Sequence, residues 1–150
     1  MSKEEKMDND LDATLIRYQK FAEQLTDESV EEFREFASPN VRYRDPLADA
    51  RGIDAALAYM HKWFTDFDDL QFEIKDYAQR GRQAFTHWRM IFRIKKSPKR
   101  LWELDGVSKF IFDDAGKIED KIDYWDASPF LESFPVLGKV VTLIKKLMTR

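Results

Sequence analysis

Apolar residues recur along the first part of the chain at the spacing of amphipathic helices. From Asp10 to about Leu25 they fall every three or four positions, which places them on one helical face. The same spacing predicts a second, short helix over residues 27–37 and a third over residues 53–67. Ser38–Pro39–Asn40 is expected to end the second helix, because a residue before proline avoids helical backbone angles. The pattern therefore predicts three helices before residue 68.

The later part of the chain alternates between apolar and polar residues, as β-strands do. A first short strand is predicted over residues 41–45, before the third helix, and four longer ones follow it. The longer strands are expected from residue 70 to about 77, at 84–94, at 101–112 and at 117–125. Gly106 lies inside one of them and predicts a bulge or bend of a strongly curved sheet. Helices followed by antiparallel strands predict an α+β architecture, with the helices on one side of the sheet.

The two ends of the chain differ from this central part. Residues 1–10 are polar and are interpreted as a flexible tail, residues 11–128 as the domain, and residues 129–150 as a helical extension. The extension contains a predicted amphipathic helix over residues 138–148. One face of this helix is apolar, and the basic residues that contrast with it are Lys139, Lys145, Lys146 and Arg150. We expect it to pack over a pocket mouth or across a dimer interface. Attachment to a membrane surface is the less favoured alternative.

Composition narrows the class of protein. A chain of 150 residues with a net charge of −3 fits one globular domain and argues against a nucleic-acid partner. Cys 0 excludes disulfides, and only His61 and His87 could supply imidazole, so neither a metal site nor another cofactor is expected. Residues 1–10 lack the apolar segment of a signal peptide, which predicts a cytoplasmic protein. The many aromatic residues suit a core or a pocket for flat apolar molecules.

Five short segments resemble, in order and spacing, the nuclear transport factor 2-like superfamily, which includes SnoaL-like and ketosteroid isomerase-like proteins. They are Tyr18 in the first helix, Tyr43–Leu47, Arg51–Gly52, Phe110–Ile118 and Ile122–Asp126. The segment Phe134–Gly138 with its basic helix resembles uncharacterised bacterial members. The resemblance covers about residues 11–128. It implies a cone-shaped α+β barrel, a bent sheet around a pocket, and a homodimer formed through the outer face of the sheet.

The resemblance also implies candidate catalytic residues. Asp45 stands where isomerase-like members carry a general-base aspartate, and Tyr18 where they carry a hydrogen-bond donor to the developing enolate oxygen. These members place a protonated aspartic acid in the third long strand, but Ser108 occupies that position here. Steroid isomerisation of the known kind is therefore not expected. An ordinary turn at Asp45 and an ordinary helix at Tyr18 are the structural alternatives.

Asp123 corresponds to the last-strand carboxylate of epoxide hydrolase-like and cyclase-like members. Epoxide opening also needs a second carboxylate and an arginine. Strict alternation in the strand over 84–94 turns Trp88 and Met90 toward the pocket and His87 and Arg89 away from it, so these partners are missing. A salt bridge to Lys121, Arg89 or Arg44 is the structural alternative for Asp123.

Two main functions follow from these residues. One is an isomerase, cyclase or dehydratase that uses Asp45 or Asp123 together with Tyr18. The other is a non-catalytic module that binds an apolar small molecule or a partner protein. A peripheral membrane protein is the third. In each case the cone is expected to be lined by Tyr43, Tyr59, Trp63, Trp88, Met90, Ser108, Phe110 and Trp125.

Overall fold

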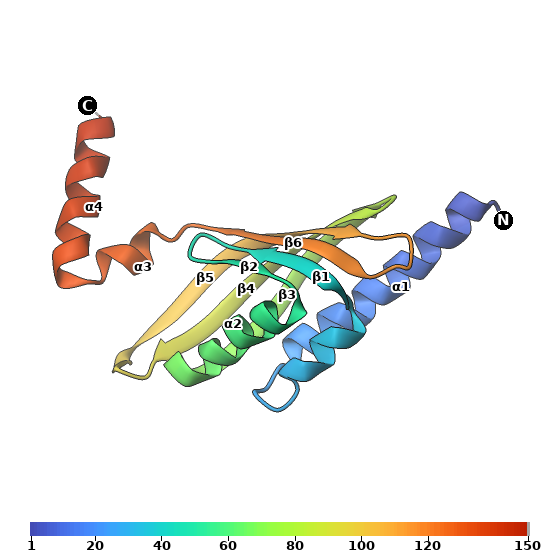
Figure 1. Ribbon diagram of the computed structural model, residues 1–150. Coiled ribbons are helices and arrows are strands. Elements are labelled where there is room, and N and C mark those ends of the chain that lie inside the picture. Colours follow the sequence, from blue (N-terminus) through green and yellow to red (C-terminus); the bar gives the residue numbers. More distant parts are fainter. Residues whose placement is uncertain (150) are drawn as a thin grey trace.

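The computed structural model describes residues 1–149 and confirms the predicted architecture, with helices packed on a curved six-stranded sheet (Figure 1). Along the chain the elements are α1 (Lys3–Glu23), the 3-10 helix η1 (Val30–Glu35), β1 (Ala37–Arg44), β2 (Asp49–Arg51), α2 (Ile53–Asp66), β3 (Phe67–Arg80), β4 (Gln83–Ile94), β5 (Ser97–Phe112), β6 (Ile118–Trp125), α3 (Ser128–Glu132) and α4 (Pro135–Met148). Arg150, which the sequence assigned to the basic face of the last helix, lies outside the described residues.

The sheet is mixed, with the strand order β2-β1-β6-β5-β4-β3. Strand β1 runs parallel to β6, and all other neighbours are antiparallel. Register shifts interrupt β3 in two places, and such bulges increase the bend and twist of long strands. Helices α1 and α2 lie on the same side of the sheet (Figure 1). The bend therefore encloses space between the sheet and these helices.

Two clusters of buried apolar side chains lie in this space, at different parts of the sheet. The larger one packs α1, η1 and α2 against the sheet and includes Leu15, Phe33, Val41 and Phe110, all almost fully buried. The smaller one lies on β4 and β5 and consists of Trp88, Met90, Phe92, Trp102 and Leu104. No described helix covers the second cluster as α1 covers the first, since Phe130 of α3 is the one helical residue packed against it. One end of the cone is thus filled, and the other is left open.

Two of the predicted element boundaries were wrong for identifiable reasons. Helix α1 begins at Lys3 rather than Asp10, because Ser2 and Glu5 form a reciprocal capping box that starts it. Residues 3–10 are therefore helical and not a flexible tail. Strand β1 begins at Ala37 and continues through Pro39, where a helix stop was expected. Its register with β6 shifts between Ala37 and Arg42, which accommodates a residue that has no N–H to donate.

Gly106 has a different role from the predicted bulge. The pairing of β5 with β4 stays in register through Gly106, which lies directly opposite Trp88. A Cβ atom at this position would collide with the six-membered part of the Trp88 indole. Glycine is needed here because the indole ring lies across the backbone of the neighbouring strand, and this contact fixes the ring inside the cone.

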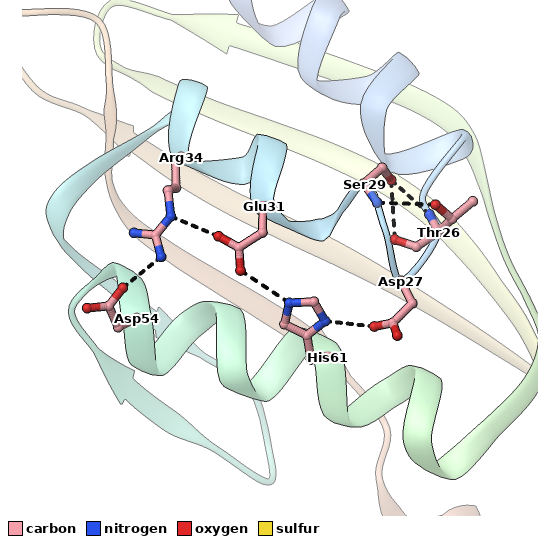
Figure 2. A network of polar contacts seen from close by, with 7 residues as sticks. All are labelled: Thr26, Asp27, Ser29, Glu31, Arg34, Asp54 and His61. Atoms are coloured by element: carbon pink, nitrogen blue, oxygen red, sulfur yellow. Dashed lines mark hydrogen bonds and ion pairs between the residues drawn. The ribbon is translucent and has the colours of Figure 1, made fainter.

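A surface network joins η1 to α2 (Figure 2). The His61 ring contacts Asp27 through Nδ1 at 2.7 Å and Glu31 through Nε2 at 3.3 Å. Arg34 extends the network from Glu31 to Asp54. The pKa of His61 is raised, first by its hydrogen bond to Asp27 and then by that to Glu31. The protonated imidazole therefore stabilises this junction.

Replacing His61 with glutamine is expected to destabilise the protein more at pH 6 than at pH 9. A histidine whose pKa is raised by folding contributes its stability below the unfolded pKa of about 6.5, and loses that contribution as the pH rises through the folded value. The side chain is partly exposed, so the difference should not exceed about 1 kcal/mol. Urea unfolding at both pH values measures it, and an equal loss at the two would contradict the assignment.

Candidate functional site

A cavity of about 890 Å³ occupies the open end of the cone. Its walls come from α2 and α3 and from β1, β3, β4, β5 and β6. Most of the lining side chains are aromatic or aliphatic, among them Trp63, Phe67, Phe72, Trp88, Met90, Phe92, Trp102, Leu104, Trp125 and Phe130. Its volume and its apolar lining fit a binding site for a small organic molecule. Such sites are mostly apolar and contain a few precisely placed polar groups. The polar groups deepest in the fold come from β1, α2 and β6.

Asp123 is one of these polar groups, and it is 8% exposed. Its Oδ2 accepts a hydrogen bond from the Tyr43 hydroxyl at 2.6 Å, and its Oδ1 accepts one from Ser108 Oγ at 2.5 Å. The Lys121 ammonium lies 2.6 Å from both carboxylate oxygens and is itself 5% exposed. Alternation along β6 explains the pair, because residues two apart share a face of the sheet. A carboxylate and an ammonium buried together need such complete pairing.

A second layer of contacts holds these groups in place. The Trp88 indole N–H donates to Ser108 Oγ at 2.9 Å, so the serine hydroxyl is directed toward Asp123. The Lys121 ammonium also lies 4.1 Å from the centre of the Tyr43 ring, within the range of a cation–π contact. Each side chain around Asp123 is therefore oriented by at least one further partner.

Asp45 is another carboxylate that lines the large cavity. Its Oδ1 accepts the backbone N–H groups of Leu47 and Ala48, both at 2.8 Å, in a turn that follows β1. Its Oδ2 accepts the hydroxyl of Tyr59 from α2 at 2.6 Å. Burial raises the pKa of Asp45, and the negative charge of Asp123 adds to this, while the hydrogen bonds from Tyr59 and the backbone oppose it. Carboxyl groups shifted in this way are common at functional sites.

Tyr18 lies on the other side of Asp123. It lines a separate inner cavity of about 40 Å³, together with Thr86, Ser108 and Lys121. Asp123 borders both cavities, whereas Tyr18 does not line the large one and Asp45 does not line the small one. Burial, with a smaller contribution from Asp123, raises the pKa of the Tyr18 phenol well above its usual value. The three predicted catalytic residues are therefore distributed over two adjoining cavities.

The residues expected to line the cone divide in the same way. Tyr59, Met90 and Trp125 line the large cavity alone, whereas Tyr43, Trp63 and Trp88 border both cavities. Ser108 and Phe110 line the small cavity. His87 and Arg89 lie on the outer face of the sheet, where His87 contacts Asp105 and Arg89 contacts Glu73 and Glu103.

The charged partner of Asp123 is Lys121, one of the three alternatives left open by the sequence. Arg44 instead pairs with Asp120 at 2.7 Å, and within residues 1–149 neither Asp45 nor Asp123 is bound to a surface arginine. Sequence reasoning did not place Lys121 in the site. The available signal was its position two residues before Asp123 in the same strand, which puts both side chains on one face.

Solved structures of other proteins share this fold. A protein from Jannaschia sp. CCS1, provisionally named a SnoaL-like polyketide cyclase, aligns with a TM-score of 0.74 and 16% identity over 91% of this chain and 96% of its own. A nuclear transport factor 2-like protein of unknown function from Burkholderia pseudomallei aligns with a TM-score of 0.71 and 13% identity, over 84% and 98% of the two chains.

A third structure comes from Catenulispora acidiphila, has a ketosteroid isomerase-like fold and was solved with trimethylamine. It aligns with a TM-score of 0.66 and 12% identity, over 79% of this chain and 88% of its own. At these identities the similarity concerns the fold alone. A comparison with curated proteins finds no match.

The sheet order, the cone and the similarity to these neighbours define the fold class as nuclear transport factor 2-like. Within it, the sequence profile of the SnoaL-like domain matches residues 18–120. The chain belongs to the SnoaL-like domain family.

Proposed function

We propose that the large cavity binds an apolar, ring-containing small molecule and that Asp45 transfers a proton on it. The reaction would be of the isomerase, cyclase or dehydratase type and would need neither metal nor cofactor. The observation that carries this proposal is that Asp45 and Asp123 both line one aromatic cavity of about 890 Å³, whose third carboxylate, Asp66, is paired with Lys62. Carboxylates that line an apolar cavity and have a shifted pKa, as Asp45 does, are candidates for acid–base chemistry on what binds there.

Asp45 is the better proton acceptor of the two. Its Oδ2 receives one described hydrogen bond, from Tyr59. The raised pKa of Asp45 also makes it a stronger base, which reduces the gap to the pKa of a carbon acid. In the proposed step Asp45 removes a proton from a carbon next to a ligand carbonyl and returns it to the same or a neighbouring carbon. The oxygens of Asp123 are already occupied by Tyr43, Ser108 and Lys121, which suits a fixed counter-charge rather than a base.

Tyr43 is the donor best placed to meet negative charge on a ligand oxygen. It lines the large cavity, and its hydroxyl hydrogen bonds to Asp123. If this hydrogen bond turned to a developing oxygen anion, Lys121 and Ser108 would still balance Asp123. Tyr18, the donor implied by the resemblance, lines the inner cavity and not the large one. It would therefore influence a bound ligand through Asp123 and not by direct contact. The name of the Jannaschia protein, a polyketide cyclase, supports a ring-containing or ring-forming ligand.

A non-catalytic binding module is the alternative. It is favoured by the saturated hydrogen bonding of Asp123, which resembles a structural ion pair as much as a reactive group. The same aromatic walls would then hold an apolar ligand without changing it. The homodimer and the cytoplasmic location expected from the sequence stay predictions.

Deuterium exchange separates the two functions. Purified protein is first examined by native mass spectrometry for co-purified small molecules, and then incubated in D₂O with a panel of polycyclic ketones. Wild-type protein is expected to bind at least one of them, seen as quenching of tryptophan fluorescence, and to exchange its α-protons faster than buffer does. Binding without faster exchange would support the binding module. Absence of any ligand of this class would contradict both functions.

A further inference from the structure

Helix α4 turns its small and polar side toward the protein and its apolar side outward. Gly138 is the one buried residue of α4 in the described part of the chain, and a Cβ atom there would collide with the Glu132 backbone of α3. Lys145 pairs with Glu132 from the same side. A surface helix of a globular domain ordinarily buries its apolar stripe instead. The orientation of α4 is therefore set by contacts that leave this stripe exposed.

The exposed stripe is extensive. Its residues range from 41% exposed at Leu137 to 81% at Met148, and they comprise Val136, Leu137, Val140, Leu143, Ile144, Leu147 and Met148. Figure 1 shows α4 standing away from the sheet and joined to it through α3. None of the described helices is long and apolar enough to cross a membrane. Something outside the described fold must cover this stripe, since apolar surface of this extent usually marks an interaction site.

The charges of α4 indicate what that partner is. Between Pro135 and Met148 there are three lysines and no acidic residue. Lys139 and Lys146 form no ion pair within residues 1–149, and the helical repeat places both along one edge of the apolar stripe. A second α4 would bring lysines against lysines, whereas helix pairs usually set acidic residues opposite them. The apolar stripe of α4 and the lysines at its edge therefore complement a partner that has an apolar layer with negative charges at its boundary.

A second basic segment lies at the same end of the molecule. The β4–β5 turn, taken together with the first residues of β5, carries Lys95, Lys96, Lys99 and Arg100, all exposed, in a chain whose net charge is −3. The Arg100 guanidinium lies 3.6 Å from the centre of the Trp102 ring, and that ring is 5.6 Å from Phe130 of α3. Trp102 thus connects the turn with α3, through a cation–π contact on one side and an edge-to-face aromatic contact on the other, and both segments border the large cavity.

We propose that α4 and the β4–β5 turn form a docking surface for an anionic lipid membrane. The apolar stripe of α4, about 20 Å long, would lie in the boundary between headgroups and acyl chains. Lys139 and Lys146 would extend from its edge to the phosphates, as lysines at such positions do, and the turn would add further attraction. The docking surface does not depend on a reaction in the cavity. If the proposed function holds as well, the cavity mouth faces the bilayer that dissolves its ligand.

Co-sedimentation of the full chain with vesicles tests the proposal. The protein is expected to bind vesicles of phosphatidylcholine mixed with phosphatidylglycerol at least about tenfold more tightly than phosphatidylcholine alone, and to lose binding as salt is added. Leu143→Glu/Leu147→Glu should lower binding by about tenfold or more, because it places charges in the apolar stripe. Lys139→Gln/Lys146→Gln should lower binding to the anionic vesicles by about tenfold.

A matched control removes the same charge elsewhere. Lys3→Gln/Lys6→Gln changes two exposed lysines of α1, near the N-terminus and far from α4 in Figure 1, and should bind like the wild type. All changed residues are exposed, so circular dichroism should show an unchanged fold. Equal binding by the Leu143→Glu/Leu147→Glu variant and the wild type would overturn the proposal. The proposal would also be overturned if the wild type formed a dimer and bound no vesicles, and if the Leu143→Glu/Leu147→Glu variant were monomeric. That result would assign the apolar stripe to contact with a second copy of the chain.

Discussion

Replacing Asp123 with alanine is expected to lower the free energy of unfolding by about 3–5 kcal/mol, because it leaves the buried ammonium of Lys121 without a counter-charge. The hydroxyls of Tyr43 and Ser108 lose their acceptor in the same step. Removing one partner of a buried ion pair costs far more stability than the intact pair contributes, because the remaining charge stays desolvated. Urea unfolding at pH 7, followed by tryptophan fluorescence and circular dichroism, measures the loss.

Two further variants isolate this cause. Asp49→Ala removes a carboxylate from an exposed pair with Arg42 and should cost much less stability than Asp123→Ala, because water solvates the remaining guanidinium. Lys121→Met/Asp123→Leu removes both buried charges and should recover most of the stability lost by Asp123→Ala. A loss below about 1 kcal/mol for Asp123→Ala, comparable to an exposed pair, would show that water reaches Lys121 and that the pair is not a closed buried unit.

Replacing Asp45 with asparagine is expected to slow proton exchange on a bound ketone by about 10²–10⁴-fold, the usual contribution of a general base. Ligand affinity should change little, because the aromatic walls provide most of the contact surface. The wild-type rate should also fall as the pH drops through the raised pKa of Asp45, since only the carboxylate accepts a proton. Exchange measured by NMR in D₂O over a range of pH values tests both expectations.

Stability provides an internal check on this variant. A carboxyl group whose pKa is raised by folding favours the fold when protonated, and this contribution is lost as the pH rises through the folded value. At pH 7 the ionised Asp45 therefore weakens the fold, and Asp45→Asn should be at least as stable as the wild type. Asp120→Asn, a change in the ion pair with Arg44 outside both cavities, should leave exchange unaffected. Undiminished exchange in Asp45→Asn would remove Asp45 from the mechanism.

Local patterns predicted most of the fold, because each rests on neighbouring residues alone. The helical repeat located α2 to within one residue, and alternation located β4 and assigned the two faces of Trp88 and Arg89. The pattern failed at residues 3–10, where polar residues surround the helix on all sides and produce no periodicity. The capping signal of Ser2 and Glu5 was present there, but it is short.

The candidate site was only partly predictable. The family resemblance singled out Asp45 and Asp123, and Lys121 was one of three possible partners of Asp123, but the tyrosines that hydrogen bond to the two carboxylates could not be predicted. Tyr59 lies fourteen residues from Asp45, and Tyr43 lies 80 residues from Asp123. No local repeat connects such pairs, since the parallel pairing of β1 with β6 and the packing of α2 bring them together. The separation of Tyr18 from Asp45 into two cavities has the same origin.

By itself the sequence determined the α+β class, the family, the inner and outer faces of the strands, and the amphipathic character of the last helix. These properties depend on residue type and spacing, which the chain carries before it folds. The tertiary structure alone decided that Lys121 is buried against Asp123 and that Gly106 makes room for Trp88. It also decided that α4 faces its protein through Gly138 rather than through its apolar stripe. Each of these depends on what a distant segment places opposite a side chain, and no local pattern contains that information.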